Sequence, residues 1–184
     1  FLREAMSEVS EELRETAVYN TILTGLAEGR NTLQELYSHT GFSRAKISVY
    51  LKSLMELELV EKVFSFDSEG PANTKKGYYR IKSHLVDFYY RFVYPHASDA
   101  ELLSGKAFYE KYIEKDFRAF VDVHFKEICR EYMEGENTAG KLPFALTKIG
   151  EWIGKQGCVD IVGSTEGENC LIGACFFMPM VTYE

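Results

Sequence analysis

Residues 41–63 read GFSRAKISVYLKSLMELELVEKV, and this stretch predicts the fold of the first half of the chain. Gly41 is suited to end one helix, and Ser43 can cap the next. From there, Ile47, Leu51 and Leu54 fall on one face of a helix. The run LVEKV that follows is typical of a β-strand. We therefore expect a turn, a helix and a strand in this order.

The flanking residues extend the pattern on both sides. Upstream, an apolar helical repeat stops at Gly29, and Thr32 can cap the short helix TLQELYSHT. Downstream, the polar loop DSEGPANTKKG is followed by the strand YYRI. Three short helices and a terminal β-hairpin predict a winged helix-turn-helix over residues 17–82. Residues 1–16 would form a linker helix before it.

The third helix and the wing carry the candidate DNA contacts. They are Arg44, Lys46, Lys52, Ser53, Lys75 and Lys76. Lysines of this kind contact phosphates, which position a protein without reading the base sequence. The outward face offers no Arg, Asn or Gln for a bidentate base contact, and Arg44 lies near its edge. The alternative is that the winged helix packs against a neighbouring domain and its lysines are solvated.

Charge and composition limit the partners. The chain of 184 residues carries a net charge of −7, which argues against a protein that coats nucleic acids generally. From Ala17 to Lys82, however, nine lysines and arginines face seven acidic residues, so DNA contact is expected from the first half. No apolar run reaches the roughly 20 residues that span a bilayer. We expect a cytoplasmic protein with no membrane partner.

The cysteines do not predict a metal site. Cys129, Cys158, Cys170 and Cys175 form no C-x-x-C pair, and no histidine lies within helical reach of any of them. Free thiols are expected, although Cys158 and Cys170 could face each other across a hairpin.

The middle of the chain is helical and aromatic. Leu85, Phe88, Tyr89 and Phe92 follow a helical repeat that predicts a buried face. A longer helix begins near Asp116, and the GEN motif at 135–137 is expected to end it.

Seven segments along the chain occur in an order that is familiar from a known family: YLKSLMELELVEKV, KKGYYRI, FYYRFVYP, FKEICREYM, IGEWIG, VDIVG and LIGACFF. This series resembles the C-terminal region of archaeal-type AAA+ ATPases, a family also widespread in bacteria. The resemblance implies a mixed α+β chain. Its winged helix is followed, over residues 83–184, by a helical segment and a degenerate PD-(D/E)XK, restriction-endonuclease-like α/β domain that is incomplete at its C-terminus. It also implies an ATPase module upstream of Phe1 that binds ATP and Mg²⁺; the present sequence has no P-loop of its own.

The resemblance assigns the nuclease positions to Lys126, Asp160, Ala174 and Phe176. Relatives with nuclease activity would have an Asp at position 160, a Glu-x-Lys pair at 174 and 176, and a carboxylate on the helix at 126. They need these residues because Mg²⁺ requires several oxygen ligands. Here only Asp160 remains. Since alternate strand residues share a face, we expect the apolar Phe176 to fill the former metal pocket.

Three functions remain open. The chain could be the DNA-binding and interaction region of an AAA+ ATPase, with non-specific duplex DNA and its own ATPase module as partners. It could be an active Mg²⁺-dependent nuclease in which Glu127 or Glu131 has replaced the lost ligands. It could also be purely a protein-interaction or homo-oligomerisation module. Whether the chain is itself an enzyme is not decided by these residues.

Overall fold

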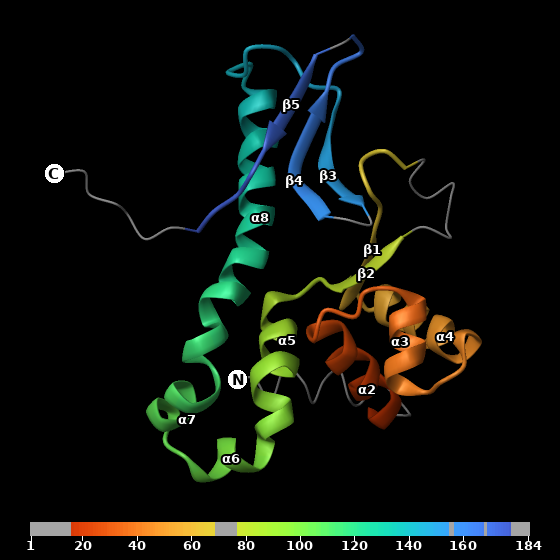
Figure 1. The fold of residues 1–184 in the computed structure, drawn as a ribbon, viewed down its shortest axis with the longest axis vertical. Helices are drawn as coiled ribbons and strands as arrows, with labels where there is room; N and C mark the ends of the chain where they lie inside the picture. Colours follow the sequence, from red (N-terminus) through yellow and green to blue (C-terminus); the bar gives the residue numbers. More distant parts are fainter. Residues whose placement is uncertain (1–15, 69–76, 155–156, 168, 178–184) are drawn as a thin grey trace, which may run out of the picture. The chain divides into compact units, whose positions relative to one another are not determined.

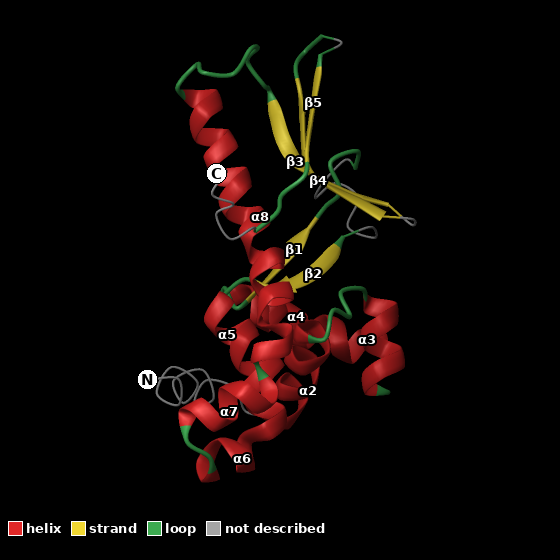
Figure 2. Cartoon of the chain, turned by 60° about the vertical axis from the view of Figure 1, so that its left-hand side comes forward, coloured by secondary structure: helices red, strands yellow, loops and turns green. Residues whose placement is uncertain are grey.

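The computed structural model describes residues 16–68, 77–154, 157–167 and 169–177. The described chain forms two compact units (Figure 1). The first contains residues 16–63 and 77–113, and the second contains residues 64–68 and the chain from residue 114 onward. Figure 2 shows the strands in two separate groups, a hairpin and a three-stranded sheet.

The first unit begins with a winged helix-turn-helix. Its elements are α2 (Thr16–Ala27), α3 (Leu33–Thr40), α4 (Arg44–Glu56), β1 (Val60–Val63) and β2 (Tyr78–Ile81). The two strands are antiparallel, with Val60 opposite Ile81. The expected fold class, a winged helix followed by an α/β domain in a mixed α+β chain, is confirmed.

Local signals fix the turn between α3 and α4. Thr32 forms a capping box with Glu35 at the start of α3. Gly41 ends this helix in the left-handed conformation, with φ of 70°, which glycine adopts without steric cost. The Ser43 hydroxyl then accepts a hydrogen bond from the Lys46 amide and caps α4. These caps place α4 against α2 and α3 around a shared core.

That core is aliphatic and closely packed. Its fully buried side chains are Ile22, Leu23, Leu36, Ile47, Leu51, Leu54 and Val60. Burying a side chain of this size contributes about 1.5–3 kcal/mol, so this cluster supplies most of the driving force for folding of the winged helix.

The aromatic segment that follows packs only partly as the helical repeat predicts. It contains α5 (His84–Phe88), the π-helix η3 (Tyr89–Val93) and the 3₁₀ turn η4 (Tyr94–His96). Val86 and Tyr90 are buried, whereas Leu85 is 38% exposed and Tyr89 is only partly buried. The expected face was wrong by one position at Leu85 and Tyr89, because Val86 and Tyr90 are the residues that enter the core of the winged helix. Phe92 is buried as predicted.

Tyr90 joins this segment to the winged helix. Its hydroxyl donates to Asn20 Oδ1 at 2.6 Å, and burial raises the pKa of the phenol. Val86 and Tyr90 belong to the same hydrophobic core as α2 and α4. The first unit consequently continues past Lys82, through α6 (Ala97–Leu102) and α7 (Gly105–Tyr112), to residue 113.

The second unit places one long helix beside a small sheet (Figure 1). Its elements are α8 (Glu114–Thr138), β3 (Lys148–Gly154), β4 (Gly157–Ser164) and β5 (Cys170–Gly173). The strands are antiparallel in the order β3-β4-β5, so that Val162 lies between Gly150 and Ile172. The buried apolar side chains are Phe120, Leu146, Ile161, Val162 and Cys175.

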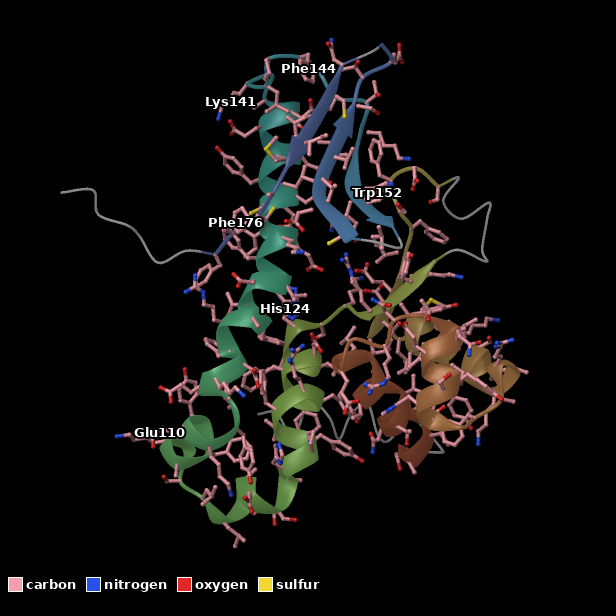
Figure 3. All side chains as sticks on the ribbon, viewed as in Figure 1. Glu110, His124, Lys141, Phe144, Trp152 and Phe176 are labelled. Atoms are coloured by element: carbon pink, nitrogen blue, oxygen red, sulfur yellow. The ribbon has the colours of Figure 1, made fainter. Side chains whose placement is uncertain are left out.

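Residues 65–67 lie along β3. The Phe66 amide donates to the Glu151 carbonyl at 2.7 Å, and the Ser65 hydroxyl accepts from the Ile153 amide at 2.9 Å. Asp67 accepts from the indole of Trp152, which Figure 3 marks. Ser65, Phe66 and the first residue of the expected wing loop, Asp67, thus bind the sheet of the second unit. Within the described residues, no helix combines the length and the apolar character that crossing a membrane requires.

The long helix passes through the expected stop. Gly135 lies inside α8, which ends only at Thr138, before Gly140 adopts φ of 66°. One glycine in a helix costs only about 1 kcal/mol relative to alanine, which a long helix tolerates. Asn137 then fixes the exit, because its side chain bonds both the amide and the carbonyl of Leu146.

Gly135, inside α8, and Gly140, just after its end, give a matched test. Gly135→Ala should stabilise the protein by about 0.5–1 kcal/mol, because alanine favours helix and nothing lies within 4 Å of the added Cβ. Gly140→Ala should destabilise it by about 1 kcal/mol, because the site is equally open but needs a left-handed backbone. Urea unfolding followed by circular dichroism measures both. Equal effects of the two substitutions would contradict a helix that ends at Thr138.

Candidate functional site

The outward face of α4 is the candidate nucleic-acid interface. Its exposed residues are Arg44, Ala45, Ser48, Val49, Lys52 and Glu56. Ser48 was missed by the sequence analysis, although it lies one helical turn after Arg44. Lys46 and Ser53 were expected on this face, but both are half-buried. The Ser53 hydroxyl bonds the Val49 carbonyl of its own helix.

The lysines of α4 have partners within the protein. The Lys46 ammonium lies over the rings of Phe42 and Tyr50, 4.8 and 5.6 Å from their centroids. Lys52 Nζ lies 3.7 Å from Glu56 Oε1, one turn along the helix. Such an exposed pair contributes only a few tenths of a kcal/mol, so a phosphate can displace the Glu56 carboxylate. The other two expected contacts, Lys75 and Lys76, lie outside the described residues.

Arg44 is held at the start of α4 by side chains of α3. Its guanidinium donates to Gln34 Oε1 and lies 5.4 Å from the centroid of the Tyr37 ring. Gln34 in turn donates to the Ser38 hydroxyl at 3.3 Å. Sequence reasoning gave no role to Gln34 or Tyr37, because their contact with Arg44 forms only when the turn at Gly41 brings α3 and α4 together.

Asp160 is the centre of a second arrangement, in the α/β unit. Lys126, on α8, places its Nζ 2.6 Å from Asp160 Oδ1. The Cys175 amide, just beyond β5, donates to Asp160 Oδ2 at 3.0 Å. The structure therefore brings Lys126 and Asp160 together, as the expected nuclease geometry requires. It joins them as an ion pair and not as two metal ligands.

This pairing keeps both groups charged. Burial opposes ionisation of Asp160, but the bonds from the Cys175 amide and the Lys126 ammonium outweigh it and lower the pKa of the carboxyl. Burial likewise opposes the charge on Lys126, while its bond to Asp160 raises the pKa of the ammonium above its usual value. Each group stabilises the charge of the other.

The two positions after β5 differ from the expectation. Phe176 is 72% exposed, and Ala174 is exposed as well, so the prediction that Phe176 fills a former metal pocket was wrong. The buried residue is Cys175, with 8% exposed. In an extended chain, successive side chains point in opposite directions, and here the inward one is the cysteine. Figure 3 marks Phe176 beyond the end of β5.

The chain after β5 is also bound to α8. The Phe177 amide donates to Asp122 Oδ1 at 3.2 Å, and its ring lies 5.4 Å from that of Phe125 in an edge-on contact. Arg118 donates to the Phe177 carbonyl at 3.4 Å. These bonds hold the Cys175 amide where it can reach Asp160.

A catalytic Mg²⁺ does not fit these residues. The ion needs near-octahedral oxygen ligands, with carboxylates as the usual protein contribution. Both oxygens of Asp160 are engaged by nitrogen donors, and one of these donors is a cation. Ala174 and Phe176 offer no ligand atom. The arrangement holds an ion pair.

The four cysteines are free thiols. Cys158 lies opposite Ile153 and Cys170 opposite Ser164, so the two do not face each other across the hairpin as considered above. Burial and contact with Cys129 raise the pKa of Cys175 to about 11, which keeps this thiol protonated at neutral pH.

Two family models match the chain. Residues 20–62 match the model described as "Bacterial regulatory protein, arsR family", a helix-turn-helix family; they cover most of α2, all of α3 and α4, and the start of the hairpin. Residues 89–179 match DUF234, described as "Archaea bacterial proteins of unknown function". The chain thus contains one segment similar to this helix-turn-helix family and a second segment similar to DUF234.

A curated protein of Methanocaldococcus jannaschii, named "Uncharacterized protein MJECL04", is 29% identical over 158 residues. The match covers 86% of the present chain and 35% of that protein, so the chain spans about a third of the length of this relative. No solved structure matches.

The ion pair predicts a specific pH dependence. Because the folded pKa of Asp160 is below its usual 3.8, the stabilisation from its charge is present above that pH and is lost as the pH falls through the lower, folded value. Asp160→Asn keeps the size and an acceptor for Cys175, and should cost roughly 1–3 kcal/mol at pH 7 for a pair that is only partly buried. Urea unfolding of both proteins between pH 2 and 8 measures the difference, which should shrink below about pH 4. A difference that stays constant down to pH 2 would show that the charge of Asp160 is not responsible.

Proposed function

We propose that this chain is the nucleic-acid-binding and interaction region of an AAA+ ATPase, and that its nuclease-like α/β unit has no catalytic activity. The observation that carries the first part is the exposed face of α4 within a winged helix-turn-helix. The match of residues 20–62 to a family of regulatory proteins supports the same interpretation.

Binding is expected to be weak and dominated by phosphate contacts. Several cations of the winged helix are compensated by neighbouring carboxylates, as in the pairs Arg80–Glu61 at 2.5 Å and Lys82–Glu58 at 3.1 Å. These pairs reduce the positive potential that would attract DNA from a distance. Contact with the duplex then depends on the cations at the surface of α4 itself.

The ATPase parent is supported by the ordered series of segments from YLKSLMELELVEKV to LIGACFF and by the DUF234 match. The much greater length of the M. jannaschii relative is compatible with an additional module. ATP and Mg²⁺ would bind there, because the present sequence lacks the glycine-rich loop that cradles phosphates. In such a protein, the ATPase module could act on DNA that the winged helix holds.

A protein-binding role for the α/β unit is a second candidate. Ile172 and Phe176 are 73% and 72% exposed, and Val123 and Ile128 on α8 are each 56% exposed. Large apolar side chains at this exposure are common in protein interfaces. The ATPase module and a second copy of the chain are the partners we propose for these exposed side chains.

Replacing a single lysine tests the DNA interface. Lys52→Ala should weaken binding of the 184-residue chain to a mixed-sequence duplex several-fold at low salt. It should also reduce the slope of log affinity against log salt by about 0.9, because one phosphate contact is lost. Fluorescence anisotropy at several salt concentrations measures both quantities.

Lys106→Ala is the matched control. Lys106, on α7, is 3.7 Å from Glu110 in the same i,i+4 geometry as Lys52 and Glu56, but it lies outside the helix-turn-helix. It should leave affinity and salt slope unchanged. Equal losses from the two substitutions would mean that α4 is not the DNA surface.

The second part of the proposal predicts an absence of cleavage. The chain incubated with duplex DNA and millimolar Mg²⁺ or Mn²⁺ should leave the substrate intact on a gel, because Lys126 and the Cys175 amide already occupy the two oxygens of Asp160. Metal-dependent cleavage that disappears in Asp160→Asn would identify an active nuclease and overturn this part.

A further inference from the structure

The α4 surface differs from a simple phosphate-binding face in the size of its side chains. Between Arg44 and Lys52, the exposed positions hold Ala45, Ser48 and Val49. Small side chains let a helix approach the floor of the major groove, where base edges carry a distinct pattern of donors and acceptors. Val49 is 64% exposed, and an apolar side chain there can contact the methyl group of thymine. This face is shaped for contact with bases.

Arg44 is the only arginine of α4 and its first residue. Helix-turn-helix proteins contact base edges with the N-terminal residues of this helix. The guanidinium carries five N–H donors in a planar fork, and the bond to Gln34 uses one of them. Enough donors remain for a bidentate contact to O6 and N7 of guanine, the commonest specific contact of arginine.

The contacts with α3 hold this fork before DNA arrives. Gln34 accepts from Nη2, the Tyr37 ring lies beside the guanidinium, and Gln34 is itself bonded to Ser38. Fixing a long side chain in advance reduces the entropy lost on binding, which favours a contact that requires one geometry. Lys46 and Lys52 lack a planar fork and can serve only as point charges.

From these contacts we infer that Arg44, positioned by Gln34 and Tyr37, reads a guanine in the major groove, so that the chain prefers particular DNA sequences. This inference rests on the proposed DNA-binding function and revises the expectation of purely non-specific contact. Arg44 touches the base, whereas Gln34 acts through Arg44 as a positioning residue.

The test selects duplexes from a pool with a randomised central segment. The full 184-residue chain, Arg44→Lys, Gln34→Ala and Lys52→Ala are each incubated with the pool, and the bound duplexes are sequenced. The unmodified chain should enrich guanine at one position. Arg44→Lys should lose that enrichment but keep its charge and most of its overall affinity. Gln34→Ala should reduce the enrichment, and Lys52→Ala should keep it while binding less tightly.

A duplex with 7-deazaguanine at the enriched position then isolates the contact, since this base lacks N7. It should bind the unmodified chain about tenfold more weakly than guanine does, and should bind Arg44→Lys as guanine does. Circular dichroism checks that each variant is folded.

Binding without any base preference, or a guanine preference that survives in Arg44→Lys, would overturn the inference and leave the DNA-binding function standing. Failure of the unmodified chain to bind any duplex would overturn both.

Discussion

One carboxylate group holds three segments of the α/β unit together. Asp160, on β4, is bonded to Lys126 on α8 and to the Cys175 amide in the chain that follows β5. Partly buried charges of this kind are costly when one partner is missing, so the three segments are coupled through this point. The bonds of Asp122 and Arg118 to Phe177 extend the attachment along α8.

The same interaction constrains what the unit can do. A metal ion needs the Asp160 oxygens and at least one further oxygen ligand, and an ammonium group lies where a second carboxylate would be expected. In the function proposed above, the α/β unit is a scaffold with exposed apolar side chains. In this account, the winged helix supplies contact with DNA and the second unit supplies contact with protein.

The parts of the fold that the sequence predicted are those with local causes. Thr32, Gly41 and Ser43 cap or end helices through bonds to residues within four positions, and such signals can be read without the tertiary structure. The exchange of Leu85 for Val86 on the buried face was missed because both residues are apolar, and the repeat alone does not show which of them meets the core of the winged helix. Gly135 was taken for a stop because propensity ignores the packing that carries α8 onward.

The residues of the candidate sites likewise divide into those that the sequence predicted and those whose role depends on the tertiary structure. Asp160 and Lys126 were found because their order in the chain resembles a known arrangement, but their bond depends on α8 crossing the sheet. After β5, Cys175 is buried and Phe176 is exposed, the reverse of the prediction. A shift of one residue along an extended chain is enough to exchange the buried and the exposed positions. Gln34 and Tyr37 carried no signal, since they acquire a role only through Arg44.

The central claim is that Lys126 takes the place of a metal at Asp160, and the NMR signal of the Cys175 amide tests it most directly. This amide is bonded to Asp160 Oδ2, so a paramagnetic Mn²⁺ ion on the carboxylate would broaden its signal beyond detection. The account predicts that the signal stays sharp when Mn²⁺ is added to the ¹⁵N-labelled protein at micromolar concentration. Selective loss of the Cys175 signal, reversed by a chelator, would contradict it.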